Sequence, residues 1–335
     1  MLGSTNLAVS SIGLGLAALG RPGYINLGHA NDLMPSHYAV ATMQGQAWHV
    51  LDAAWQAGIR YFDVARSYGR AEEFLGSWLR ARQINPTSLT IGSKWGYVYT
   101  ANWQVQAERH EVKDHSLALL QRQWQESQAN LTSNFVSSPS YLQLYQVHSA
   151  TLESGILTNR AVLEQLGRLK SLGLTIGLSL SGANQADVLR QALTVNVGGV
   201  RVFDCVQATW NLLETSAESA LQEAHAAGLG IIIKETLANG RLTLRNQHPA
   251  FAEKLKLLQQ QAARLQTTVD ALALAAVLAQ PWVDVALSGA TTVDQLHANI
   301  AARQVAWDEE AALVLATLCE MPAVYWDERS RMAWN

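Results

Sequence analysis

Short hydrophobic runs, most of which end in a polar residue, alternate along the chain with alanine-rich amphipathic stretches. The stretches, such as QAWHVLDAAWQAG (residues 46–58), carry apolar residues at three- and four-residue steps and often end at a glycine, which is typical of helices. Strand candidates that alternate with helices predict parallel strands joined by crossovers. The eight candidates are residues 11–15, 61–63, 89–94, 141–148, 175–179, 203–207, 230–234 and 284–288.

The spacing of these runs points to a closed barrel. From the second run to the last, the terminal polar residues are Asp63, Lys94, His148, Ser179, Gln207, Lys234 and Ser288. The steps between them are 31, 54, 31, 28, 27 and 54 residues, and one strand with its helix takes about 30 residues. We predict a (β/α)8 TIM barrel, one domain over residues 1–335, with two loop insertions; an open doubly wound sheet is the alternative. Residues 1–9 look like a short N-terminal β-hairpin under the barrel.

Composition narrows the class of protein. With 49% hydrophobic and 15% charged residues, the 335-residue chain can bury a large core. A net charge of -3 and the lack of any basic run argue against a nucleic-acid partner. The two cysteines have no metal-ligand spacing, the N-terminus has no signal-peptide pattern, and the longest apolar segment, residues 271–279, is too short to span a membrane. We predict a soluble cytoplasmic protein without a metal site; the oligomeric state stays open.

The polar residues at the strand ends are candidates for chemistry, because side chains from different strands of a TIM barrel converge at that rim. A carboxylate at the end of an apolar strand, Asp63, needs a partner, and Lys94 on the next strand can supply it. A cation held there would stabilise a phenolate, so we expect the pKa of Tyr68 to fall from its usual value of about 10. His148 could then donate a hydrogen bond to a substrate oxygen. Each residue also has a structural interpretation, as a helix cap, a solvent-facing lysine or a core histidine.

Three of these segments resemble motifs of the aldo-keto reductase family. They are FDVARSYG (residues 62–69), IGSKWG (91–96) and YLQLYQVH (141–148), and the likeness extends over nearly the whole chain. The resemblance implies a catalytic tetrad of Asp63, Tyr68, Lys94 and His148, with Tyr68 as proton donor to a carbonyl during reduction. The implied substrate is a small carbonyl compound (aldehyde, ketone or sugar) or the corresponding alcohol.

The resemblance also implies a nicotinamide coenzyme. NADP(H) is the default of the family, and NAD(H) is possible because no arginine occupies the usual 2′-phosphate position near Gln295. The implied cofactor-binding residues are Ser179, Gln207, Lys234, Leu237, Ala238, Gly240, Gly289, Thr291, Gln295 and Asn299. Lys234 stands where many members have an aromatic residue that stacks on the nicotinamide, and it can pair with Glu235 instead.

Two further segments bear on the substrate. The long segment of residues 17–43, which carries Tyr24, is either a lid or a structural insertion, and the C-terminal tail is expected to cover the mouth of the barrel. Tyr24, Trp95 and Trp210 are the candidate substrate-lining residues. Two other functions remain open: a cofactor-binding regulatory protein with little turnover, and a Schiff-base lyase that uses Lys94 or Lys234.

Overall fold

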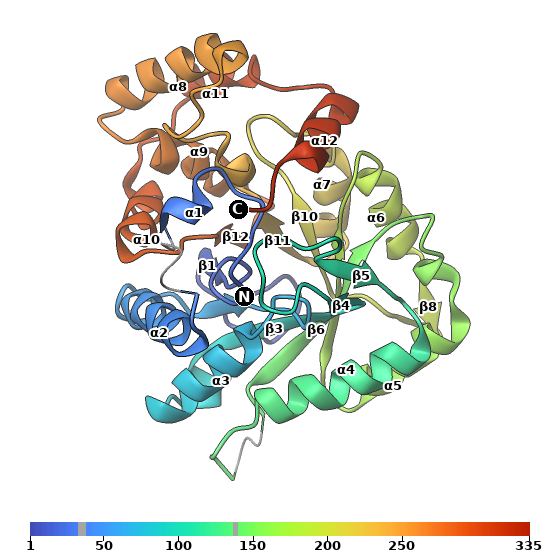
Figure 1. Cartoon of the computed structure of the whole chain (residues 1–335). Coiled ribbons are helices and arrows are strands. Elements are labelled where there is room, and N and C mark those ends of the chain that lie inside the picture. Colours follow the sequence, from blue (N-terminus) through green and yellow to red (C-terminus); the bar gives the residue numbers. More distant parts are fainter. Residues whose placement is uncertain (33–37, 137–139) are drawn as a thin grey trace.

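The computed structural model describes residues 1–32, 38–136 and 140–335. Eight parallel strands close a barrel in the order β1-β12-β11-β10-β7-β6-β3-β2, with helices around it (Figure 1). The strands are β1 (Ile12–Gly15), β2 (Tyr61–Asp63), β3 (Thr90–Trp95), β6 (Leu142–Ala150), β7 (Thr175–Leu180), β10 (Cys205–Thr209), β11 (Gly230–Lys234) and β12 (Val285–Ser288). The predicted barrel is confirmed, and the open sheet is excluded.

Side-chain alternation along the strands divides the barrel interior from the layer beneath the helices. In β2, Tyr61 belongs to the layer inside the barrel, whereas Phe62 points outward and packs on Trp78, with ring centroids 5.8 Å apart. The same alternation turns Asp63 back to the interior at the carboxyl end of the strand. The lower interior layer consists of Leu2, Tyr61, Leu144, Cys205, Ile232, Val285 and Leu287.

The N-terminal segment closes the lower end of the barrel without forming the predicted hairpin. Residues 1–9, all of which are described, form a turn and contain no strand. Within this turn, the Leu2 amide donates to the Leu7 carbonyl at 2.9 Å. The amides of Gly3 and Ser4 instead donate to Asp284 and to the Gly228 carbonyl of the barrel. Leu2 is fully buried, so the segment is a plug held by the barrel and not by its own strand pairing.

Helices follow the strands and shield their outer faces. The helices next to the barrel are α2 (Val40–Gln56), α3 (Ala71–Ala81), α4 (Leu117–Asn130), α5 (Arg160–Ser171), α6 (Gln185–Leu193), α7 (Glu218–Ala226), α9 (Val269–Leu278) and α10 (Val293–Ile300). Helix α9 contains most of the longest apolar segment of the sequence and is almost entirely buried. None of the helices in the described ranges is both long and apolar enough to cross a membrane.

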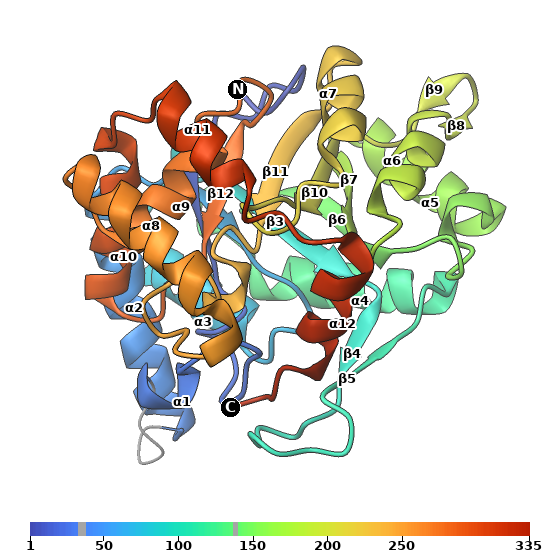
Figure 2. The same ribbon diagram turned by 90° about the horizontal axis from the view of Figure 1, so that it is seen from above.

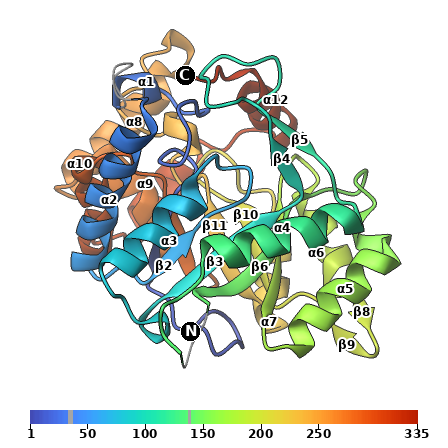
Figure 3. The ribbon, with the colours of Figure 1, turned by 60° about the horizontal axis from the view of Figure 1, so that its bottom comes forward.

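The two long steps in the strand spacing are loop insertions, as predicted. The first contains an antiparallel hairpin of β4 (Tyr97–Tyr99) and β5 (Glu111–Lys113), and the second contains α8 (Ala252–Arg264). Figures 2 and 3 show the C-terminal helix α12 (Pro322–Arg331) and the C-terminus at the same end of the molecule as this hairpin, with the N-terminus at the opposite end. The tail therefore covers the carboxyl ends of the strands, as predicted.

The remaining short elements belong neither to the barrel strands nor to the helices next to the barrel. They are α1 (His29–Asp32), α11 (Glu309–Ala316), the hairpin of β8 (Asn196–Val197) and β9 (Val200–Arg201), and 3-10 turns at Pro86–Ser88, Ile156–Thr158, Ala238–Gly240, Pro249–Phe251 and Ala301–Gln304. Of these, α1 and the turn at Ala238–Gly240 help to build the site described next.

Candidate active site

A cavity of about 370 Å³ opens at the carboxyl end of the barrel strands. Strand ends supply its base, and the segment after β1, the loop after β11 and the C-terminal tail supply its walls. Most of the residues that the sequence singled out line it: Tyr24, Asp63, Tyr68, His148, Gln207, Lys234, Leu237, Gly240, Gly289, Gln295 and Asn299.

The buried carboxylate of Asp63 is fully satisfied at the base of this cavity. Lys94 Nζ lies 2.5 Å from Asp63 Oδ2 and also donates to the Val64 carbonyl at 3.0 Å. Gln207 Nε2 donates to the other carboxylate oxygen at 2.7 Å. Burial lowers the pKa of Lys94, and the charge and hydrogen bond of Asp63 oppose that shift. Asp63 and Lys94 are thus held together on neighbouring strands β2 and β3.

Tyr68 and His148 meet this pair. The Lys94 ammonium lies 4.7 Å from the centroid of the Tyr68 ring, and the Tyr68 and His148 rings meet edge to face with centroids 5.5 Å apart. The loop that carries Tyr68 is fixed because the Arg66 amide donates to the Lys94 carbonyl at 3.0 Å. His148 Nδ1 lies 3.4 Å from Ser67 Oγ, which leaves Nε2 as the nitrogen available to a ligand. The four residues of the predicted tetrad therefore lie together.

The predicted direction of the Tyr68 pKa is wrong. Burial, followed by the negative charge of Asp63, raises the pKa of Tyr68 well above its usual value, and the nearby Arg21 only partly opposes this. The expectation failed because it left out the burial of the phenol, and because the charge of Lys94 is offset by Asp63 beside it. Burial also lowers the pKa of His148 well below its usual value, helped by the charges of Lys94 and Lys234. At neutral pH the site holds a protonated phenol and a neutral imidazole.

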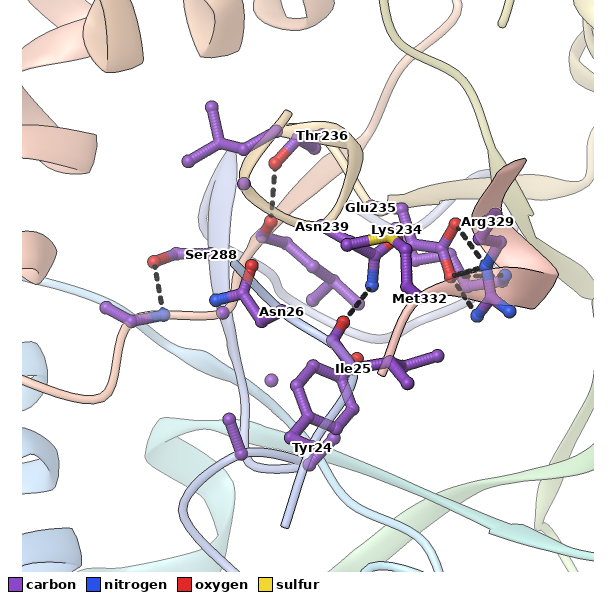
Figure 4. A pocket seen from close by; sticks show the side chains of 18 of the residues that line it. Tyr24, Ile25, Asn26, Lys234, Glu235, Thr236, Asn239, Ser288, Arg329 and Met332 are labelled. Atoms are coloured by element: carbon purple, nitrogen blue, oxygen red, sulfur yellow. Dashed lines mark hydrogen bonds and ion pairs between the residues drawn. The ribbon is translucent and has the colours of Figure 1, made fainter. Parts of the chain in front are cut away.

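Lys234 and Glu235, at the end of β11, connect the barrel to the C-terminal helix (Figure 4). The expected pair between them has an N–O distance of 3.8 Å, but the main partner of Glu235 is Arg329 of α12, whose Nε lies 2.8 Å from Oε1. Lys234 Nζ donates to Thr209 Oγ1 at 2.9 Å. Burial lowers the pKa of Lys234 to about 8, although Glu235 opposes this shift.

The loop after β11 crosses the segment that follows β1. Asn239 Nδ2 donates to the Ile25 carbonyl at 2.7 Å, and the Leu27 amide donates to the Asn239 carbonyl at 3.0 Å (Figure 4). Gly240 has a φ of +87°, and a Cβ there would lie 2.9 Å from Asn26 Oδ1, so the crossing requires glycine. Asn239 lines the cavity, and its Oδ1 is buried without a hydrogen-bond partner among the described residues.

Sequence reasoning missed Arg21, a buried cation in the cavity wall. Its guanidinium carbon lies 5.5 Å from the centroid of the Tyr68 ring and 4.7 Å from that of Trp334. Its Nη1 donates to the Ser67 carbonyl at 2.9 Å and to Glu111 at 3.0 Å. No local pattern marked Arg21, because its neighbours in the sequence are glycine and proline and its partners come from distant segments.

Two of the three expected substrate-lining residues do not reach the cavity. Trp95 follows Lys94 in β3, so alternation points it outward, and it is fully buried against His115 with ring centroids 5.7 Å apart. Trp210 packs on Trp282, with centroids 5.6 Å apart. These assignments are corrected: both tryptophans belong to the core. Tyr24 does line the cavity. It belongs to the described part of the 17–43 segment, whereas residues 33–37 are not among the described residues.

Three of the expected cofactor-binding residues also lie just outside the cavity wall. Ser179 Oγ accepts a hydrogen bond from the Ser149 amide at 2.8 Å, and Ser181 reaches the cavity instead. Thr291 donates through its amide and its hydroxyl to Gln295 Oε1, at 2.9 and 3.0 Å. Ala238 is buried behind the turn that it begins. They support the wall without lining it.

Comparisons with known proteins agree on one family. The model of the aldo/keto reductase family matches residues 11–314. The chain is 25% identical, over 90% of its length and 89% of the relative, to the uncharacterized oxidoreductase YqkF of Bacillus subtilis (strain 168). It is 26% identical, over 96% of its length and 92% of the relative, to an L-galactose dehydrogenase of Arabidopsis thaliana. A solved aldo-keto reductase from Bacillus halodurans, in its holo form, shares the fold with a TM-score of 0.73, 21% identity and 96% coverage of both chains.

Proposed function

Because the chain belongs to the aldo/keto reductase family, we propose that it interconverts a carbonyl and an alcohol by hydride transfer, with Tyr68 as the acid and base at the reacting oxygen. The observation that carries this proposal is the meeting of Asp63, Tyr68, Lys94 and His148 at the base of one cavity. A nicotinamide coenzyme, when bound, supplies or accepts the hydride.

In the direction of reduction, the Tyr68 hydroxyl gives its proton to the carbonyl oxygen while the carbonyl carbon gains the hydride, and the product is the neutral alcohol. The raised pKa of Tyr68 keeps that proton in place until the oxygen develops charge. Arg21, whose charge already opposes the rise of the Tyr68 pKa, stabilises the phenolate that remains, and Lys94 lies beside the same ring. His148 Nε2 orients the same oxygen. In oxidation the phenolate takes the proton back.

In this proposal, a dinucleotide extends from this corner of the cavity along the wall of the barrel. Gln207 and Lys234 lie near the tetrad, Leu237 and Gly240 lie in the crossing loop, and Gly289, Gln295 and Asn299 line the wall before and within α10. These residues would hold the coenzyme. Asn239 Oδ1 in the same wall, which has no partner in the described part of the chain, offers a hydrogen-bond acceptor to it.

Small polar carbonyl compounds, sugars among them, are the substrates that this cavity favours. Charged groups of Arg21, Glu111, Lys234 and Glu235 surround the space above Tyr68, and aromatic rings stand beside them. Aromatic walls with a few polar anchors suit hydroxylated substrates. The likeness to an L-galactose dehydrogenase supports the same class.

Replacing Tyr68 by phenylalanine tests the assignment. A positioned acid contributes about 10²- to 10⁴-fold in rate, so kcat in Tyr68→Phe should fall by at least about 10²-fold on a panel of aldehydes, ketones and free sugars. Coenzyme affinity, followed by the fluorescence of the reduced form, should change by less than about two-fold, because the side chain keeps its ring. Tyr99→Phe, on β4 and outside the cavity lining, is the matched control and should keep full activity.

Two alternative functions predict different results with the same panel of substrates. A Schiff-base lyase needs an accessible lysine, and Lys234, which lines the cavity with a pKa of about 8, is the candidate, whereas Lys94 is enclosed. A borohydride-trapped adduct on Lys234 would replace our proposal by that function. Tight coenzyme binding without turnover of any substrate by the wild type would favour a regulatory role.

A further inference from the structure

The end of the cavity remote from Tyr68 is built from α10, from Asp270 at the start of α9 and from Arg245 of the second insertion. Gln295 and Asn299 of α10 line it, together with Arg245 and Asp270. Under the proposed function, the reacting ring of a dinucleotide lies beside Tyr68 and His148. The adenosine ribose must then lie toward this remote end, since the two ends of the molecule cannot share one site.

Asp32, the last residue of α1, lies behind Arg245 and is not itself part of the cavity lining. Its carboxylate accepts two hydrogen bonds from the Arg245 guanidinium, of 2.8 and 2.6 Å. Thr291 Oγ1, whose shorter hydrogen bond goes to Gln295, lies 3.3 Å from Asp32 Oδ2. The Asp32 side chain is only 7% exposed, whereas that of Arg245 is 38% exposed. Although burial opposes ionisation of Asp32, the hydrogen bonds from Arg245 and its neighbours lower its pKa, so it is charged at neutral pH.

The charges at this end do not suit a phosphate. Arg245 is the one cation that the described cavity lining brings there, and Asp32 occupies it with a bidentate pair. Asp270 adds a second carboxyl group. A phosphate monoester, which carries about -1.5 to -2 charges at pH 7, would have to displace Asp32 from Arg245 and leave that carboxylate buried without its partner.

Ribose hydroxyls carry no charge, so they can bind at this end without breaking the Asp32–Arg245 pair, and the carboxyl group of Asp270 in the lining can accept a hydrogen bond from them. We therefore propose that Asp32 makes this chain select NAD(H) over NADP(H). The discrimination comes from a segment far from α10 in the sequence, and it reverses the default that the family resemblance implied. This inference rests on the proposed function, since it assumes that a nicotinamide dinucleotide occupies the cavity.

Direct binding of NADH and NADPH, without any substrate, tests the inference. Wild-type protein should bind NADH at least about 10-fold more tightly than NADPH, the size expected for one charged hydrogen bond gained or lost. In Asp32→Asn, Arg245 is released, and the ratio of the two dissociation constants should move toward NADPH by at least about 10-fold. Adding Arg245→Met to that variant should abolish the gain.

Asp308→Asn is the matched control, because Asp308 forms an equally bidentate pair with Arg264 outside the cavity lining. It should leave the ratio unchanged. Wild-type protein that binds NADPH as tightly as NADH overturns the inference, as does an Asp32→Asn variant that behaves like the control. Should Asp32→Asn fold poorly, the wild-type ratio alone decides. Failure to bind either coenzyme would instead refute the proposed function, so the two failures are distinguishable.

Discussion

The base of the cavity and its cover are built on different principles. At the base, Asp63, Lys94 and His148 are side chains of adjacent strands, and the parallel register of the barrel sets their positions. The cover consists of the segment after β1, the β4–β5 hairpin and the C-terminal tail, and ion pairs between distant residues hold it, such as Glu235–Arg329 and Asp32–Arg245. Backbone register therefore sets where a proton can move, and side-chain pairs set which molecules can enter.

The largest loss of stability and turnover should come from breaking the Asp63–Lys94 pair at the base of the cavity. Lys94→Met leaves the Asp63 carboxylate buried without its cation, and the loss of one partner of a buried pair costs about 3–5 kcal/mol. We expect the free energy of unfolding, measured by urea titration, to fall by that amount, and turnover to fall with it.

Lys234→Met is the matched control at the edge of the cover. Burial already opposes the charge of Lys234, and its nearest polar partner in the described residues is the neutral Thr209 hydroxyl. Removing this ammonium should cost clearly less stability than removing that of Lys94. Equal losses in the two variants would show that the base is no more tightly constrained than the cover.

Releasing the C-terminal helix should have an intermediate effect. Arg329→Met removes the main partner of Glu235, so α12 should exchange its amide hydrogens faster, and KM should rise more than kcat falls, because the tetrad is untouched. Arg331→Met is the control, since Arg331 pairs with Asp327 in the same helix on the exposed surface.

The same pair predicts a pH dependence. Burial favours the neutral acid, but Arg329 and Lys234 overcome it and lower the pKa of Glu235 from 4.5 to about 2. A depressed carboxyl pKa stabilises the fold above the unfolded value, and that contribution is lost as the pH falls from 4.5 toward about 2. The stability difference between wild type and Arg329→Met, about 3 kcal/mol at most, should therefore shrink over this interval. A difference that is constant down to pH 2.5 would contradict the assignment of that pKa shift to Arg329.

The two regions also differ in how far the sequence predicted them. The strand ends were predicted to within two residues because hydrophobic runs, spacing and alternation are local properties. The same alternation, applied one residue further, would have turned Trp95 away from the cavity. Arg21 and Asp32 could not be found in this way, because their roles depend on partners 90 and 213 residues away. The pKa of Tyr68 was predicted in the wrong direction because one pair of charges was considered and burial was not.

The smallest effect on catalysis should come from Trp210, which sequence proximity to Gln207 had suggested as a cavity residue. Trp210 is 4% exposed, packs on Trp282 and donates to Glu218 at 3.3 Å. Trp210→Phe should lower the free energy of unfolding by about 1–2 kcal/mol through lost packing and one lost hydrogen bond, and it should leave KM within about two-fold.

Trp334 gives the contrast in the cover. Its ring stacks on His110 with centroids 3.9 Å apart, lies 4.7 Å from the Arg21 guanidinium carbon and lines the cavity. Trp334→Phe should therefore raise KM several-fold and should cost less stability than Trp210→Phe, because Trp334 is only half-buried. Steady-state kinetics and thermal unfolding of both variants separate the two roles. If Trp210→Phe raised KM as much as Trp334→Phe, Trp210 would also contribute to substrate binding. The assignment of Trp210 to the supporting core, and of Trp334 to the cover that admits the substrate, would then be wrong.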